Sequence, residues 1–101
     1  MEQQPRIPPH SQEAEKSVLG SMLISRDALE LACEMLRPDD FYFGAHRDIF
    51  EAMFRLNGRG EAVDAVTVIG ALERAGKLAA VGGASYLAEL SVFVPSAANA
   101  H

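Results

Sequence analysis

His46, Arg47 and Asp48 form the clearest catalytic pattern in the sequence. The same residue types begin the catalytic loop of protein kinases, where the aspartate acts as a base and an asparagine five residues later binds magnesium. That later position is Met53 here, and the chain has no glycine-rich phosphate loop. We therefore interpret the three residues as one side of a helix around a partly buried histidine, which makes a core hydrogen bond and performs no chemistry.

A second pattern, Gly76-Lys77, matches the end of a phosphate-binding loop. In that loop a lysine reaches the phosphates, and the hydroxyl group of the next residue binds magnesium. Ala71 stands where the first glycine is required, and Leu78 stands where the hydroxyl is required. We therefore expect no nucleotide at this segment.

Metal-ligating residue types are present but dispersed. The three histidines are His10, His46 and His101. None has a second histidine three or four residues away, so no zinc site is expected. Asp39-Asp40 is interpreted as turn and cap chemistry, and the single Cys33 as a small core residue of a protein from a reducing compartment. The sequence therefore assigns no catalytic, cofactor or metal residue.

Composition predicts one soluble globular domain: 101 residues, 49% hydrophobic and 23% charged. The apolar runs are too short for a membrane span, and the N-terminus lacks the pattern of a signal peptide, so we expect a cytoplasmic protein. The net charge is −5, and the nine basic residues are scattered among acids. Because phosphate binding requires a clustered basic face, little direct DNA binding is expected and protein partners are favoured.

The element that organises these residues is the stretch FYFGAHRDIFEAMFRL at 41–56. Its large apolar residues recur at helical spacing and predict a central helix over about 44–57, ended by Gly58 as a left-handed stop. The fold class that we expect is all-α, a compact bundle of about five short helices around this one. A further helix begins at the C-terminus.

Polar residues mark where the other helices begin. Ser11 caps the first, Asp27 with Glu30 forms a capping box for the second, and Asp64 caps the fourth, which Gly76 ends. Residues 84–93 form the fifth. Within the first helix, Gly20 and Ser21 indicate the close approach of another backbone.

The segment 63–69 has five β-branched residues, so a strand is an alternative there. The helical pattern continues too far along the chain for that alternative, and Val66, Val68, Ile69 and Leu72 are the expected buried residues. The predicted core comprises Val18, Leu19, Met22, Ile49, Phe50, Met53, Phe54, Leu72, Leu87 and Leu90.

Three regions follow from this pattern: a flexible arm at 1–9, the helical domain at 10–94, and the start of another helix at 95–101. Ser96 has the character of an N-cap. Because that helix is cut off within about its first turn, we expect the 101 residues to be a fragment of something longer.

Six segments, taken together and in order, resemble one known family. They are PPHSQEAEKSVLG (8–20), DFY (40–42), HRDIFEAM (46–53), VDAVTV (63–68), VGGASYLAEL (81–90) and VPSAAN (94–99). The chain is similar, from about residue 7 to residue 99, to the N-terminal domain of bacterial replicative DNA helicases, the DnaB family.

The resemblance implies a non-catalytic domain of a hexameric ring that unwinds DNA with ATP. ATP and Mg would belong to a C-terminal motor domain that is absent here, so no cofactor is implied for this segment. The domain would support ring assembly and dock primase through primase's C-terminal helicase-binding domain; a helicase loader is a further implied partner. Family members continue into a helical hairpin that pairs protomers. This chain stops where the hairpin should begin, which puts the self-association of this segment in question.

Glu13, Tyr86 and Glu89 are the candidate partner-binding residues, each with a structural alternative. Glu13 also suits a first-turn charge, and Tyr86 suits a core aromatic or an interface residue. Glu89 and Arg47 also suit solvated helix charges. The alternative function is an autonomous helical interaction domain or a helix-turn-helix regulator.

Overall fold

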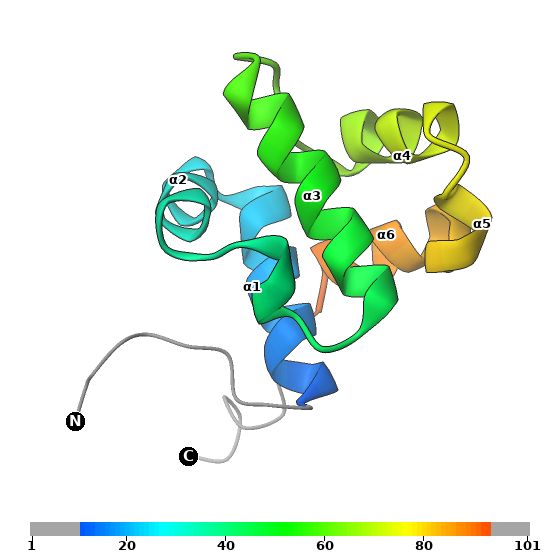
Figure 1. Cartoon of the computed structure of the whole chain (residues 1–101), viewed down its shortest axis with the longest axis horizontal. Coiled ribbons are helices and arrows are strands. Elements are labelled where there is room, and N and C mark those ends of the chain that lie inside the picture. The colour runs from blue at the N-terminus through cyan, green and yellow to red at the C-terminus, as the bar shows by residue number, and fades with distance from the viewer. Residues whose placement is uncertain (1–10, 94–101) are drawn as a thin grey trace.

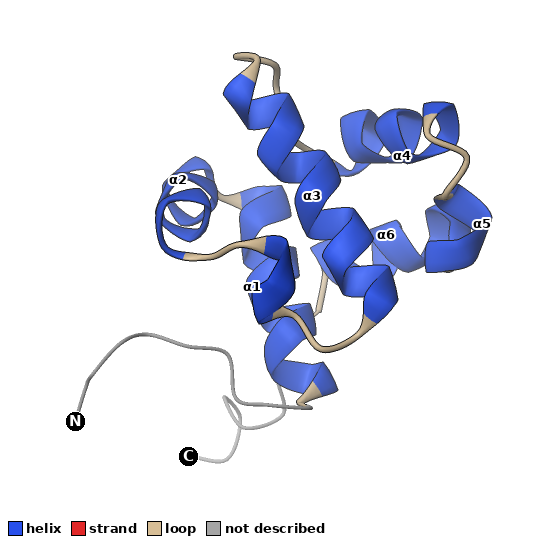
Figure 2. Ribbon diagram, in the orientation of Figure 1, coloured by secondary structure: helices blue, strands red, loops and turns tan. Residues whose placement is uncertain are grey.

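The computed structural model describes residues 11–93, and within that range all regular structure is helical (Figures 1 and 2). The elements are α1 (Gln12–Ile24), α2 (Arg26–Met35), the 3-10 turn η1 (Pro38–Asp40), α3 (Gly44–Gly58), α4 (Ala65–Arg74), α5 (Leu78–Val81) and α6 (Gly83–Ser91). The all-α prediction is confirmed. None of these helices is long and apolar enough to cross a bilayer. The arm predicted at 1–9 and the helix start predicted at 95–101 lie outside the described residues.

Helix α3 is the centre of the bundle. In Figure 1 it crosses the middle of the molecule, with α1 and α2 to its left and α4 and α5 to its right. Its Ile49, Phe50 and Met53 are fully buried because they share the side of the helix that faces the other elements. The other helices add Leu19, Met22, Leu72, Leu87 and Leu90 to the same core, while Val18 and Phe54 are partly buried at its margin.

The caps agree with the sequence at α1 and differ at α2. The Ser11 hydroxyl accepts the N–H of Ala14 at 3.2 Å. The cap of α2 is Ser25, which accepts the N–H of Ala28 at 3.1 Å. The prediction of Asp27 as this cap is wrong, because α1 ends only at Ile24 and α2 already begins at Arg26.

The N-terminus of helix α4 is capped by the reciprocal hydrogen bonds of a capping box. Each of Asp64 and Thr67 accepts the other's backbone N–H at 2.9 Å, which excludes the strand alternative. Val68 and Leu72, four residues apart, form the buried side. Val66 is 77% exposed, so its predicted burial is wrong. It lies two residues before Val68 and therefore points to the opposite side of the helix.

Two chain reversals also differ from expectation. Gly58 is the last residue of α3, and the left-handed glycine that follows is Gly60, at φ +76°. The short helix α5 lies between Gly76 and Gly82, both left-handed, and was not predicted. Four residues are too few to show a helical period.

Helices α1 and α6 touch through their backbones. A Cβ added to Gly20 would lie 2.4 Å from the carbonyl oxygen of Leu90, so only glycine fits here. The predicted close approach is confirmed at Gly20. Ser21 is exposed instead, and its hydroxyl donates to the carbonyl of Ser17 at 2.8 Å.

Candidate partner-binding site

A buried polar network joins α1, α3 and α6. The carboxylate of Glu15 is 2.7 Å from Nδ1 of His46 and accepts the N–H of Tyr42 at 2.6 Å. Nε2 of His46 is 2.6 Å from the hydroxyl of Tyr86. Glu15 and His46 are each only 1% exposed. One glutamate therefore anchors both the central helix and the turn that leads into it.

The network accounts for the proton positions of its members. The Glu15 carboxylate can only accept a hydrogen bond, so Nδ1 of His46 is the donor to it, and the Tyr86 hydroxyl is available as a donor to Nε2. Burial, followed by the nearby Glu89 and Glu15 carboxylates, raises the pKa of Tyr86. The phenol therefore stays protonated at neutral pH and can serve as that donor. In residues 11–93 no buried side-chain N or O atom lacks a partner.

Sequence reasoning missed Glu15, although one signal was present. Glu15 lies four residues before Leu19 and seven before Met22, both of which are buried, so it occupies the core side of α1. It resembled a first-turn charge because acidic residues are favoured there by the helix dipole. His46 was expected to be partly buried and to make a core hydrogen bond. It is fully buried and makes two.

Above this network lies a surface formed by Lys16, Tyr86, Glu89 and Phe93, which we call the α1–α6 surface. The ammonium of Lys16 is 2.8 Å from the Glu89 carboxylate. The same ammonium lies over two aromatic rings, 5.8 Å from the centroid of Tyr86 and 4.7 Å from that of Phe93. An aromatic centre with a mixed-charge edge has the composition of a protein-binding surface.

The structure thus brings two of the three candidate residues together. Tyr86 and Glu89 lie three residues apart on α6, and both contact Lys16 of α1. Glu13 is partly exposed and lies three residues before Lys16 on α1, which places the two on neighbouring positions of that helix. Arg47 was expected to be a solvated helix charge. Its guanidinium instead donates to the carbonyls of Phe41 and Tyr42 at 3.0 and 2.8 Å.

Other candidate groups have structural roles. The carboxylate of Asp40 accepts the N–H of Arg37 at 2.8 Å and so stabilises the turn η1, as its interpretation as a cap required. Cys33 is a free, partly buried thiol whose pKa is raised, mainly by burial. Across residues 11–93, no three His, Cys, Asp or Glu side chains are grouped closely enough to hold a metal.

These features define a small all-α domain, built around one central helix, with a mixed-charge aromatic surface on α1 and α6. Comparison with known proteins identifies its family. The chain belongs to the DnaB-like helicase N terminal domain family, whose model matches residues 7–101.

Individual relatives agree with this assignment. The chain is 52% identical over 94 residues to the replicative DNA helicase DnaB of Geobacillus stearothermophilus, covering 93% of this chain and 21% of that protein. It is 52% identical over 95 residues to the replicative DNA helicase DnaB of Mycobacterium leprae, covering 94% of this chain and 16% of that protein. The 101 residues therefore span about a fifth or less of these relatives.

A solved structure has the same fold. The crystal structure of the N-terminal domain of DnaB helicase from Mycobacterium tuberculosis matches with a TM-score of 0.82 and 53% sequence identity. The match covers 92% of this chain and 65% of that one.

Proposed function

We propose that this domain serves a hexameric replicative DNA helicase by supporting ring assembly and by docking primase at the replication fork. The longer protein would unwind duplex DNA in the cytoplasm, using ATP and Mg in a motor domain outside these residues. A helicase loader would be a further partner. The observation that carries the proposal is the family match over residues 7–101, supported by relatives that are replicative helicases.

For docking we propose the α1–α6 surface together with Glu13. The Tyr86 ring is held by the hydrogen bond between its hydroxyl and His46, so little side-chain freedom would be lost on binding. The Glu89 side chain is 54% exposed. Its ion pair with the Lys16 side chain, which is 17% exposed, lies at the edge of the surface, so the Glu89 carboxylate can exchange its partner for a cation on the bound protein.

The test measures binding of the 101-residue chain to the C-terminal helicase-binding domain of primase by titration calorimetry. We expect Tyr86→Ala to weaken binding at least about tenfold, as truncation of a central interface aromatic does. Tyr42→Ala is the matched control, because Tyr42 is 55% exposed but lies outside this surface, and it should leave the affinity within about twofold.

Circular dichroism of each variant separates an interface effect from unfolding. Removal of the Tyr86 side chain leaves Nε2 of His46 without its partner. Tyr86→Phe loses the same hydroxyl but keeps the ring, and Glu89→Ala leaves that hydrogen bond in place, so both are measured alongside. Unchanged affinity in a folded Tyr86→Ala variant would reject the docking surface. Tight, steeply salt-dependent DNA binding by this chain would favour a DNA-binding regulator instead.

A further inference from the structure

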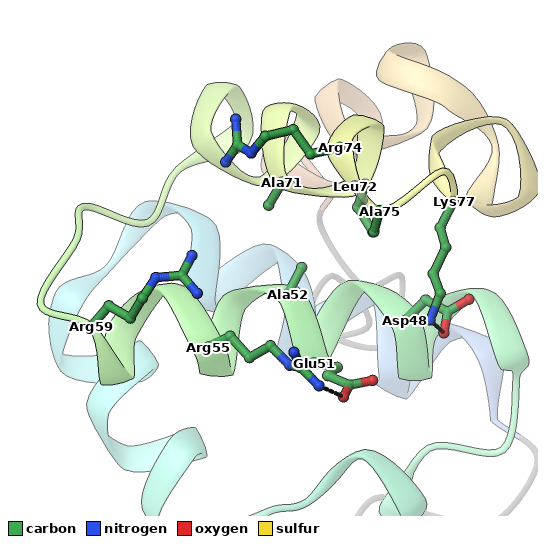
Figure 3. Close-up of a pocket in the computed structure, with 10 residues that line it drawn as sticks. All are labelled: Asp48, Glu51, Ala52, Arg55, Arg59, Ala71, Leu72, Arg74, Ala75 and Lys77. Carbon is green, nitrogen blue, oxygen red and sulfur yellow. Dashed lines mark hydrogen bonds and ion pairs between the residues drawn. The ribbon is translucent and has the colours of Figure 1, made fainter.

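The fold gathers basic residues that are scattered in the sequence. Arg55, Arg59, Arg74 and Lys77 all line one hollow of about 350 Å³ between α3 and α4 (Figure 3). These are four of the nine basic residues in a chain of net charge −5. Residues that are scattered along the sequence come together here because α4 packs against α3.

Charge within the hollow is only partly balanced. Arg55 pairs with Glu51 at 2.8 Å, and Lys77 lies 3.5 Å from Asp48. Those two acids are the only carboxylates among its described lining residues, against four cations. The hollow therefore carries an excess of two positive charges.

Of the two cations not paired inside the hollow, Arg59 has an acidic partner outside it and Arg74 has none in the described part of the chain. Arg59 contacts Glu61 outside the hollow, through an exposed pair at 3.1 Å. For Arg74, no carboxylate lies within ion-pair distance anywhere in residues 11–93. In Figure 3 the Arg59 side chain reaches into the gap from the left, the Arg74 side chain runs back along α4, and Lys77 and Asp48 join across the right end.

Beneath these charges the hollow is lined by small apolar side chains. Ala52 of α3 and Ala71 of α4 are partly buried, and Ala75 is exposed just beyond α4. Alanine methyl groups leave space between the two helices that larger side chains would fill. An apolar lining with a few convergent charges is the usual composition of a ligand site.

We propose that this α3–α4 hollow binds a short acidic segment of another protein. In this arrangement one apolar side chain of the segment packs on the alanines, while its carboxylates pair with Arg59 and Arg74. Guanidinium groups suit this role because they bind carboxylates through two parallel hydrogen bonds. The site goes beyond the proposed docking of primase on the α1–α6 surface, since its residues come from α3, α4 and the turns that follow them.

The observations favour an acidic peptide over nucleic acid. A phosphate backbone requires several cations in a row, and here two carboxylates interrupt the cationic set. A short peptide matches both the local positive charge and the apolar lining.

The test uses the 101-residue chain and a labelled peptide in which aspartates and glutamates surround one leucine and one phenylalanine. Binding is followed by fluorescence anisotropy, and the amide NMR shifts locate the site. We expect binding that weakens with salt, with shifts concentrated on α3 and α4. Arg74→Glu should weaken binding about tenfold, and Arg59→Glu should act in the same direction.

Arg26→Glu is the matched control, because it reverses the charge of another exposed arginine, on α2, which pairs only with Glu30 among the described residues. It should change the affinity less than about twofold. Equal weakening by Arg26→Glu would mean nonspecific charge attraction and would overturn the proposal. So would equally tight binding of an all-acidic peptide without apolar residues, or tighter binding of a single-stranded oligonucleotide that Arg74→Glu abolishes.

Discussion

Replacement of Glu15 by alanine tests the buried network directly. The substitution removes a carboxylate that accepts from the backbone N–H of Tyr42 at 2.6 Å and contacts Nδ1 of His46 at 2.7 Å. A third contact, from the N–H of Phe43, is 3.5 Å long and adds little. One buried donor, on His46, and one partly buried donor, the N–H of Tyr42, would thus lose their acceptor.

The expected cost follows from those two donors. Each buried group left without a partner costs about 1–3 kcal/mol. The sum is about 4 kcal/mol. Since a domain of this size is stable by only about 5–15 kcal/mol, the variant should fold weakly and melt roughly 20 °C lower.

Urea and thermal unfolding, followed by far-ultraviolet circular dichroism, measure this effect. Glu34→Ala is the control, because Glu34 is an exposed glutamate on α2 and its loss should cost less than about 0.5 kcal/mol. Glu15→Gln should fall between wild type and Glu15→Ala, since the amide oxygen can still accept one of the two bonds. The reasoning is refuted if Glu15→Ala costs less than about 1 kcal/mol, or no more than Glu34→Ala.

Three further predictions concern the core, the helix contact and Tyr86. Phe50→Ala should cost about 3–5 kcal/mol through a cavity, whereas Val66→Ala should be nearly neutral; similar urea midpoints for the two would contradict the assigned burial. Gly20→Ala should destabilise by about 1–3 kcal/mol despite its better helix propensity, because its methyl group meets a carbonyl oxygen, while Gly58→Ala, with open space around it, should be neutral or stabilising. The raised pKa of Tyr86 means that its contribution to stability is complete below about pH 10 and is lost as the pH rises through the folded-state value. Urea midpoints should therefore fall more steeply above about pH 10 in wild type than in Tyr86→Phe, and parallel curves would show that the phenol is not held by the fold.

The helices other than α5 were predictable from local signals, since caps and apolar spacing are encoded within a few residues of each other. Ser11, Asp64 and the apolar residues of α3 have the positions that those rules predict. The α2 cap was assigned wrongly because Ser25 and Asp27 are both good caps, and the choice depends on where α1 ends. Family membership was predictable from several segments in order, none of which is sufficient alone.

The site was less predictable, because its key contacts join residues far apart in the chain. Glu15 and His46 are 31 positions apart, and His46 and Tyr86 are 40 apart. Only the packing of three helices brings them together. The same holds for the α3–α4 hollow, since its lining residues come from two helices whose packing no local pattern specifies.

The absence of a side chain at Gly20 also restricts the movement of α1 relative to α6. Because their backbones are in direct contact, no intervening side chain can change rotamer and let one helix slide along the other. A protein that contacts Lys16 on one helix and Glu89 on the other would therefore bind two helices that move as one rigid unit. Pulling on either helix would be transmitted to both.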